Sequence, residues 1–227
     1  MIDLRGRRAL VTGGSRGIGA ATAQLLARAG ADVMIGYRSR TADAASVVEA
    51  LRTHGVRAAS HAADISTRAG ADSLVNATMR ELGGVDLFVA NAGVWPVEET
   101  GVAEMDDARW SNTLRENVDS VFFTTRAVSR VITDGGRIVL VSSTAGQRGE
   151  AYHADYGASK GAVISFTKSL AVELASRNVT VNSVAPGWVD TEMVSGAMAA
   201  EGRDRINAGI PLRRVASADD IDRKSVV

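Results

Sequence analysis

The sequence predicts one α/β domain in which a doubly wound parallel sheet is covered by helices on both faces. Three observations support this fold class. Short apolar runs typical of buried strands alternate with longer amphipathic stretches typical of helices. A glycine-rich turn joins the first apolar run to the first amphipathic stretch, and polar residues follow the later apolar runs. We therefore expect a single three-layer α/β/α domain that spans residues 1–227.

The composition narrows the class of protein. The chain has 227 residues, with 26 Lys plus Arg and 26 Asp plus Glu, so its charge predicts neither nucleic acid nor an anionic membrane as partner. It has no cysteine, and His54, His61 and His153 lack a metal-binding spacing, so we expect no metal. No run is apolar enough to span a bilayer, and the N-terminus lacks the apolar core of a signal peptide. These features predict a cytoplasmic enzyme or binding protein.

The first strand, turn and helix form a candidate phosphate cradle. Residues 9–11 are an apolar strand, and residues 20–29 read as a helix. Between them, Gly13 permits a tight turn, Gly17 lets a pyrophosphate approach the backbone, and Gly19 lets the helix pack closely on the sheet. This order predicts a Rossmann-type dinucleotide-binding fold, although a glycine turn can also serve packing alone.

The end of the second strand, residues 31–36, indicates which dinucleotide is bound. In a Rossmann fold this strand end meets the adenosine ribose, where an acidic residue selects NAD. No acid stands between Gly36 and Thr41. Arg38 is there instead, and Arg16 lies on the glycine loop; a guanidinium suits a 2′-phosphate. We therefore expect NADP(H). The alternative is that these arginines are solvated surface charges, which is our interpretation of Arg40.

The middle of the chain continues the alternation of strands and helices. We expect a helix over 41–54, a strand over 56–63, a helix over 71–82, a strand over 85–90, a helical stretch over 106–131 and a strand over 136–141. Polar residues follow or interrupt these elements: Asp64, Asn91, Asn117, Ser142 and Ser143. Each also has a plain structural interpretation, for example Asp64 as a helix cap and Asn117 as a hydrogen-bonded residue at a helix kink.

Tyr156 and Lys160 stand at positions i and i+4 of a predicted helix over 156–176, so their side chains share a face. A phenol has a pKa of about 10 and is a poor base at neutral pH, but a neighbouring ammonium favours the phenolate. A last strand over 179–184 leads into Pro186-Gly187, and residues 193–207 are expected to form a mobile helical flap over the substrate.

Taken in order, these motifs resemble the short-chain dehydrogenase/reductase family from Arg7 to Asp220, and most closely its 3-oxoacyl-[acyl-carrier-protein] reductase-like members. The resemblance implies reversible, NADPH-dependent reduction of a ketone, or of a 3-oxoacyl thioester, to a secondary alcohol. Ser143 and Tyr156 would bind the substrate oxygen, and Tyr156 would exchange a proton with it. Lys160 would lower the Tyr156 pKa and bind the nicotinamide ribose, while Asn117 would order a water against Lys160.

The same resemblance implies the binding residues. Asp64 would bind the adenine amino group, Asn91 would brace the sheet, and Val189 and Thr191 would hold the carboxamide or a phosphate. The implied cofactor contacts are Gly13, Ser15, Arg16, Gly17, Ile18, Gly19, Tyr37, Arg38, Ser39, Asp64, Ile65, Asn91, Ala92, Gly93, Tyr156, Lys160, Pro186, Gly187, Val189 and Thr191. The implied substrate pocket is Trp95, Ser143, Tyr152, Trp188 and Met193.

The substrate and the activity leave alternatives open. An acyl carrier protein would need a basic surface, for which Arg126, Arg130 and Arg148 are candidates, whereas the pocket aromatics also suit a free ketone, a sugar or a steroid-like substrate. The family's seventh strand is missing from this sequence, so we expect the sixth strand to have an open edge. A homotetramer or homodimer is expected if that loss permits it. The alternatives are a non-catalytic NADP-binding sensor or regulator, and a marginal fold with little activity.

Overall fold

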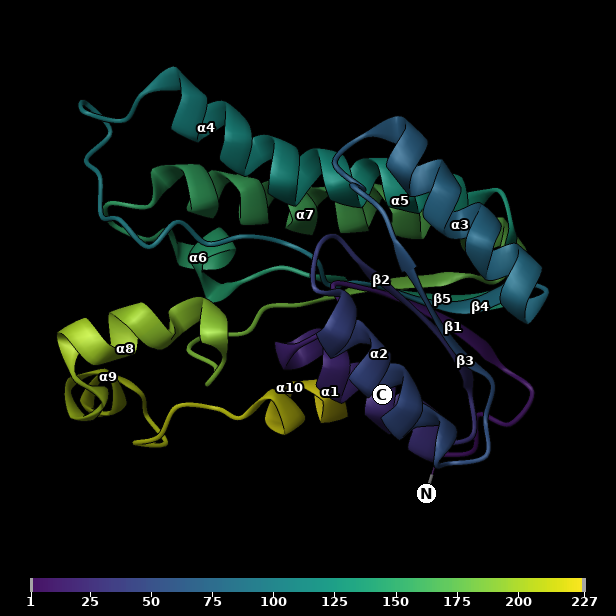
Figure 1. The fold of residues 1–227 in the computed structure, drawn as a ribbon. Helices are drawn as coiled ribbons and strands as arrows, with labels where there is room; N and C mark the ends of the chain where they lie inside the picture. The colour runs from purple at the N-terminus through teal and green to yellow at the C-terminus, as the bar shows by residue number, and fades with distance from the viewer. Residues whose placement is uncertain (1, 226–227) are drawn as a thin grey trace.

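The computed structural model describes residues 2–225, which form a parallel β-sheet with helices on both faces (Figure 1). The strand order is β3-β2-β1-β4-β5-β6. The chain therefore winds outward from β1 in one direction and then from β4 in the other, which confirms the doubly wound Rossmann-type fold. The strands are β1 (Arg8–Thr12), β2 (Asp32–Tyr37), β3 (Ala58–Ala62), β4 (Val85–Ala90), β5 (Ile132–Val141) and β6 (Thr180–Val184).

The apolar residues of the central strands are divided between two cores. Leu10 and Phe88 belong to a cluster on one face of the sheet. Their neighbours Val11 and Val89 belong to a second cluster on the other face. This division follows from the pleat, which sends successive side chains to opposite faces. Since both faces are buried, the strands are almost continuously apolar rather than alternating.

Figure 1 shows the two helical layers. The layer that packs on one core consists of α3 (Arg68–Leu82), α4 (Asp107–Leu114), α5 (Ser120–Ser129) and α7 (Ala154–Glu173). The layer on the other core consists of α1 (Gly17–Arg28), α2 (Thr41–Arg52) and α10 (Ala218–Ser225). The short elements are α6 (Thr144–Arg148), η2 (Ala175–Arg177), η3 (Glu192–Val194), α8 (Ser195–Glu201) and α9 (Arg203–Gly209).

The predicted helix over 106–131 differs from the structure in one important respect. It is divided by a π-helical turn, η1 (Arg115–Asp119), which separates α4 from α5. The Ser120 hydroxyl donates a hydrogen bond of 2.6 Å to the Glu116 carbonyl, and such bonds compete with the regular helical ladder. The following strand β5 also starts earlier than predicted, at Ile132, because a register shift against β4 accommodates the glycines before Arg137.

The predicted flap over 193–207 consists of three short helices rather than one. Met198, Ile206 and Val215 form a small apolar cluster of their own under η3, α8 and α9. In Figure 1, α8 and α9 lie together at one end of the molecule, close to α6. Among the described residues no strand pairs with the outer edge of β6. No helix within residues 2–225 is both long and apolar enough to cross a membrane.

A buried carboxylate ties the amino ends of three strands together. Asp86 on β4 accepts hydrogen bonds from the backbone N–H and the Nε of Arg8 on β1, at 2.9 and 2.7 Å. It also accepts one from the Thr133 hydroxyl on β5, at 2.8 Å. Burial acts to raise the pKa of Asp86, but the hydrogen bonds from Arg8 and Thr133 outweigh it and lower the pKa.

We predict that Asp86→Asn lowers the free energy of unfolding at pH 7 by about 2–3 kcal/mol, because charge-assisted hydrogen bonds are lost. A carboxyl whose pKa is lowered by folding stabilises the fold above its unfolded pKa of 3.8, and that contribution disappears as the pH falls through the lowered value. Urea unfolding at several pH values should therefore show a smaller loss of stability on acidification for the variant than for the wild type.

The matched control is Asp72→Asn, which removes a carboxylate from an exposed i, i+4 pair with Arg68. It should change stability by less than about 1 kcal/mol. Equal effects of the two substitutions would contradict the role given to Asp86.

Candidate active site

A cleft of about 450 Å³ lies across the carboxyl ends of the strands. Most of the residues predicted to bind cofactor or substrate line it, because parallel strands bring their carboxyl ends to one edge of the sheet. Those that do are Gly13, Ser15, Arg16, Gly17, Ile18, Tyr37, Arg38, Ser39, Asp64, Ile65, Asn91, Ala92, Gly93, Trp95, Ser143, Tyr156, Lys160, Pro186, Gly187, Trp188, Val189, Thr191 and Met193. Gly19, Asn117 and Tyr152 are not among the residues that line it.

The glycine loop is held open to the cleft by its backbone conformation. Gly13 and Gly17 have φ angles of 65° and 54°, in the left-handed region that favours glycine. A Cβ on Gly19 would lie 2.3 Å from the Gly13 carbonyl oxygen. Gly19 therefore contributes by letting α1 approach the loop closely, and it does so from outside the cleft.

Asn91 joins the ends of the two central strands. Its Nδ2 donates to the backbone carbonyls of Thr12 and Gly13, at 3.0 and 3.3 Å. The Thr12 hydroxyl accepts in return from the N–H groups of Asn91 and Ala92, at 3.0 and 3.1 Å. The expectation that Asn91 braces the sheet is confirmed by these bonds, which fix the loop after β4 against the glycine loop after β1.

Ser143, Tyr156 and Lys160 meet at the end of β5. Ser143 caps α6 by accepting a hydrogen bond of 3.1 Å from the Ala145 N–H, and its hydroxyl lies 3.4 Å from the Pro186 carbonyl. Lys160 is buried, and its Nζ donates to the Val141 carbonyl at 3.1 Å. The same Nζ lies 5.8 Å from the centroid of the Tyr156 ring. One side of α7 thus carries both Tyr156 and Lys160 into the cleft.

The pKa of Tyr156 differs from the sequence-based expectation. Burial raises it above the usual value of a phenol, and the nearby Glu150 carboxylate acts in the same direction, while a hydrogen bond with Ser143 acts against them. The expected lowering by Lys160 is therefore wrong for this geometry. Burial also lowers the pKa of Lys160, from 10.5 to about 8, so part of its favourable charge is lost above neutral pH. Tyr156 is consequently a protonated phenol at pH 7.

Asn117 is fully buried in the π-helical turn and does not reach the cleft. Its Oδ1 accepts from the Val94 N–H at 2.7 Å, and its Nδ2 donates to the Val94 carbonyl and the Ser159 hydroxyl, at 2.9 and 3.0 Å. These bonds match the plain interpretation of a hydrogen-bonded Asn at a helix irregularity. A Cβ on Gly93 would lie 2.9 Å from the Asn117 Oδ1 and 3.2 Å from the Lys160 Nζ, so all three crowd one point.

The arginines at the adenosine end of the cleft each face a carboxylate. Arg38 pairs with Glu116 on η1, at 2.7 Å. Arg16 pairs with Glu192 on η3, and Arg40 donates to the same carboxylate at 2.9 Å. Arg40 also lines the cleft, and its side chain is 48% exposed, as expected for a surface charge. No sequence pattern predicted Glu116 or Glu192 as partners of these arginines, because both come from segments far along the chain.

Asp64 adopts a local turn rather than capping the next helix. Its Oδ1 accepts from the Ser66 N–H and hydroxyl, at 3.1 and 2.7 Å, and these bonds, opposed by burial, lower the pKa of Asp64. The residue that caps α3 is Thr67, whose hydroxyl accepts from the Gly70 N–H at 3.1 Å. The alternative interpretation of Asp64 as the helix cap is therefore wrong, and its carboxylate lies in the cleft wall.

The substrate end of the cleft is aromatic with one carboxylate. Trp95 and Trp188 lie edge to face, with ring centroids 6.2 Å apart. The Trp95 Nε1 donates to Glu150 at 3.1 Å. Tyr152, which was expected in this pocket, is instead 58% exposed and is not among the residues that line the cleft. Glu150 was missed, since a lone acid in a loop carries no periodic signal.

The residues present fit a dinucleotide cofactor. Gly13, Gly17 and Gly93 line the cleft, where the absence of side chains lets a ligand approach the backbone closely. Three guanidinium groups, those of Arg16, Arg38 and Arg40, line the end where an adenosine phosphate would bind. Within the described residues, no group of three or more His, Cys, Asp or Glu side chains is arranged to hold a metal ion.

Comparisons with known proteins agree with this geometry. The sequence profile of the family described as short chain dehydrogenase matches residues 7–202. A 3-oxoacyl-[acyl-carrier-protein] reductase from Synechocystis sp. is 37% identical over 223 residues, which cover 97% of this chain and 88% of that protein. A putative ketoacyl reductase of monensin polyketide synthase from Streptomyces virginiae is 38% identical over 238 residues, covering 97% and 89%. The crystal structure of a short chain dehydrogenase from Burkholderia cenocepacia, in complex with NADP, is 37% identical, with a TM-score of 0.89 and coverage of 97% and 89%.

We predict that Lys160→Met stabilises the fold at pH 7 by about 1–3 kcal/mol, because it removes a buried charge. A Lys whose pKa is lowered from 10.5 to about 8 by folding destabilises the folded state below pH 8, and this penalty disappears as the pH rises towards 10.5. Urea unfolding between pH 7 and pH 10.5 should show the two proteins converging. Lys168→Met, at an exposed position of the same helix, is the control and should have little effect. A less stable Lys160→Met protein at pH 7 would refute the prediction.

Proposed function

Because the chain belongs to the short-chain dehydrogenase family, we propose that it is an NADPH-dependent carbonyl reductase that converts a ketone to a secondary alcohol, reversibly. Membership of this family means that the chain is an NAD(P)-dependent oxidoreductase. The finer assignments of cofactor, catalytic residues and substrate are ours. The observation that carries them is the presence of Ser143, Tyr156 and Lys160 in the same cleft as the glycine loop and Gly93.

The chemistry of the three side chains supports reduction. Ser143 and Tyr156 hold the substrate oxygen by hydrogen bonds, which polarise the carbonyl. A nicotinamide bound in the cleft would supply the hydride for the carbonyl carbon. Tyr156, whose pKa burial raises, is protonated at pH 7 and donates its proton to the oxygen. Lys160 lies over the phenol ring and stabilises the negative charge that the donation leaves.

Asn117 has a supporting part in this proposal. Its bonds to Val94 and Ser159 hold the loop after β4 against the catalytic helix α7. The Asn117 Oδ1 and the Lys160 Nζ both lie close to Gly93, and we infer that a water bridges the two side chains. Such a water would return a proton from solvent to Lys160.

The preference for NADPH rests on the arginines at the adenosine end. Arg38 and Arg16 follow β2 and β1, where the adenosine ribose binds in a Rossmann fold, and no acid stands at the end of β2. The similar short chain dehydrogenase from Burkholderia cenocepacia was crystallised in complex with NADP. Glu116 and Glu192 pair with these guanidinium groups at the cleft. A bound 2′-phosphate would replace the two carboxylates as the partner of the guanidinium groups.

The relatives are named as a 3-oxoacyl-[acyl-carrier-protein] reductase and as a putative ketoacyl reductase of a polyketide synthase. We favour an acyl thioester, and the basic side chain that supports it is Arg148, which lines the cleft. Arg126 supports it less, because its guanidinium is stacked 5.2 Å from the rings of Phe122 and Phe123. Phe122 on α5 is 41% exposed, and an exposed aromatic ring of this kind supports a contact between copies of the chain in a homo-oligomer.

We predict that Tyr156→Phe lowers kcat at least ~1,000-fold, because the proton donor is removed while the ring that contacts Lys160 is kept. Steady-state rates with an acyl thioester and with a panel of free ketones would measure the loss. The Kd for NADPH, from fluorescence titration, should change by less than about threefold. Near-normal turnover in this variant would contradict the assignment of Tyr156.

We predict that the wild type binds NADPH more tightly than NADH, and that Arg38→Ala weakens NADPH binding about 10- to 100-fold while leaving NADH binding nearly unchanged. Parallel fluorescence titrations with the two cofactors test this without any substrate. Arg68→Ala, at an exposed position of α3, is the control. A wild type that prefers NADH would contradict the roles of Arg16 and Arg38.

A further inference from the structure

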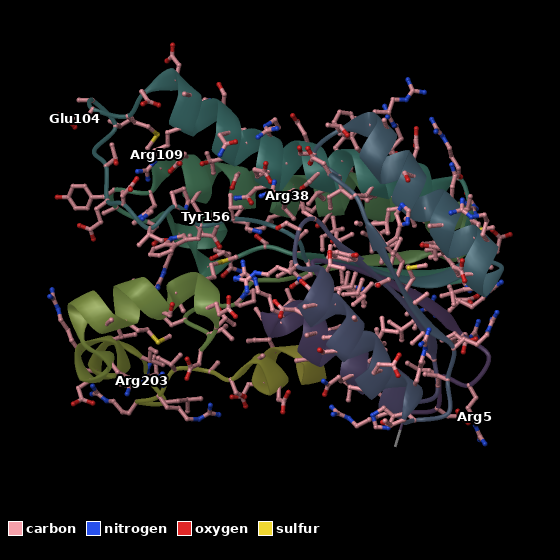
Figure 2. All side chains as sticks on the ribbon, viewed as in Figure 1. Arg5, Arg38, Glu104, Arg109, Tyr156 and Arg203 are labelled. Carbon is pink, nitrogen blue, oxygen red and sulfur yellow. The ribbon has the colours of Figure 1, made fainter. Side chains whose placement is uncertain are left out.

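We propose that Arg109 is a positioning residue, whose guanidinium fixes both loops of the substrate end of the cleft to the start of the catalytic helix α7. The kinetic meaning of this inference rests on the proposed function. Arg109 lies on α4, outside the cleft, and does not touch the reacting groups. Figure 2 labels it near Tyr156, at the end of the molecule that carries α4 and the start of α7.

One guanidinium joins three separate segments of the chain. The Arg109 Nη1 donates to the Glu98 carbonyl at 2.7 Å and also to the Thr100 hydroxyl. Its Nη2 lies 3.4 Å from the Tyr152 carbonyl, and its Nε donates to the Asp155 carboxylate at 3.2 Å. The side chain is only 15% exposed, so solvent weakens these bonds little.

Each of these segments carries a wall of the cleft. The loop that contains Glu98 also contains Trp95, and the loop that contains Tyr152 also contains Glu150. Trp95 and Glu150 are bonded to each other at 3.1 Å and both line the cleft. Asp155 immediately precedes Tyr156 on α7. A shift of Arg109 would therefore move the walls relative to the proton donor.

The loop before α7 needs such support because its backbone is strained. Tyr152 has a φ of 63°, in the left-handed region that a non-glycine residue enters at a cost of about 1–2 kcal/mol. Its carbonyl accepts from the Thr100 N–H at 3.0 Å as well as facing Arg109. Strained residues persist where the surroundings over-determine them, and here the surroundings are Thr100 and Arg109.

Asp155 explains why a cation is required at this position. Its side chain is fully buried, and its Oδ2 also accepts from the Thr113 hydroxyl at 2.7 Å. Burial acts to raise the pKa of Asp155, but the hydrogen bonds from Arg109 and Thr113 outweigh it and lower the pKa. Removing the cation altogether would leave a buried charge without a partner, which is strongly destabilising.

Substitution of Arg109 by lysine separates its two roles, which are to balance the charge of Asp155 and to bond the two loops. An ammonium can still compensate Asp155, but it lacks the planar fork that reaches Glu98, Thr100 and Tyr152 at once. Arg109→Lys should therefore fold and lose the bonds to the loops. The matched control is Arg177→Lys. Arg177 makes the same kind of fork, to Asp134 at 2.9 Å and to the Ser129 and Ile132 carbonyls, at the opposite end of the sheet.

The first measurement is amide hydrogen exchange by mass spectrometry, which needs neither substrate nor cofactor. In Arg109→Lys we expect exchange about tenfold or more faster in residues 94–101 and 149–155, with the glycine loop over 13–20 unchanged. Arg177→Lys should resemble the wild type in all three segments. Wild-type exchange rates in both loops of Arg109→Lys would overturn the proposal.

The second measurement is steady-state kinetics with a ketone or thioester that the wild type reduces, at a temperature where all variants are folded. For Arg109→Lys we expect kcat/KM to fall about 10- to 100-fold, with a raised KM and an NADPH Kd within about twofold of wild type. Thr100→Val, which removes one of the bonds, should lie between wild type and Arg109→Lys.

Two kinetic outcomes would overturn the proposal. One is a kcat/KM for Arg109→Lys equal to that of Arg177→Lys. The other is a parallel loss of NADPH affinity, because it would mean that Arg109 supports the whole fold rather than the substrate end. A wild type that reduces no carbonyl compound would count against the proposed function instead, and the exchange measurement would still decide whether Arg109 fixes the loops.

Discussion

The close packing of α7 against the end of β5 is the constraint on which the rest of the site depends. A Cβ on Gly146 would lie 2.5 Å from the Lys160 carbonyl carbon, so helix and turn are in direct backbone contact. The Ser142 hydroxyl bonds the Lys160 carbonyl at 2.8 Å, and the Lys160 Nζ bonds the Val141 carbonyl. Since α7 cannot slide along the strand, Ser143 and Tyr156 meet at a fixed separation. The same packing buries the ammonium, so the feature that builds the site also weakens the fold.

The sequence predicted the features that depend on order and spacing. The alternation of strands and helices, the glycine loop, Asn91 and the i, i+4 pair on α7 are properties of short segments, and the parallel sheet then brings them to one edge. It did not predict partners that meet only after folding. Glu192 reaches Arg16 from the far end of the chain, and the pKa of Tyr156 depends on burial that no spacing reveals.

The adenosine end and the substrate end of the cleft offer different kinds of interaction to a ligand. At the adenosine end, exposed arginines pair with carboxylates, so binding there is an exchange of one anion for another and should weaken with ionic strength. At the substrate end, stacked rings and the largely buried network around Arg109 and Asp155 fix the shape of the walls. Under the proposed function we therefore expect the selection of cofactor to be chiefly electrostatic and the selection of substrate to depend chiefly on shape.

The π-helical turn between α4 and α5 makes neighbouring residues serve opposite ends of the cleft. Glu116 pairs with Arg38 at the adenosine end, while Asn117 bonds Val94 on the substrate side. A π-turn accommodates an additional residue within a helix, so the directions in which the following side chains point around the helix axis depend on that residue. An insertion or deletion in this segment would therefore rotate both contacts out of place together. The site thus depends on the length of this turn as well as on the residues within it.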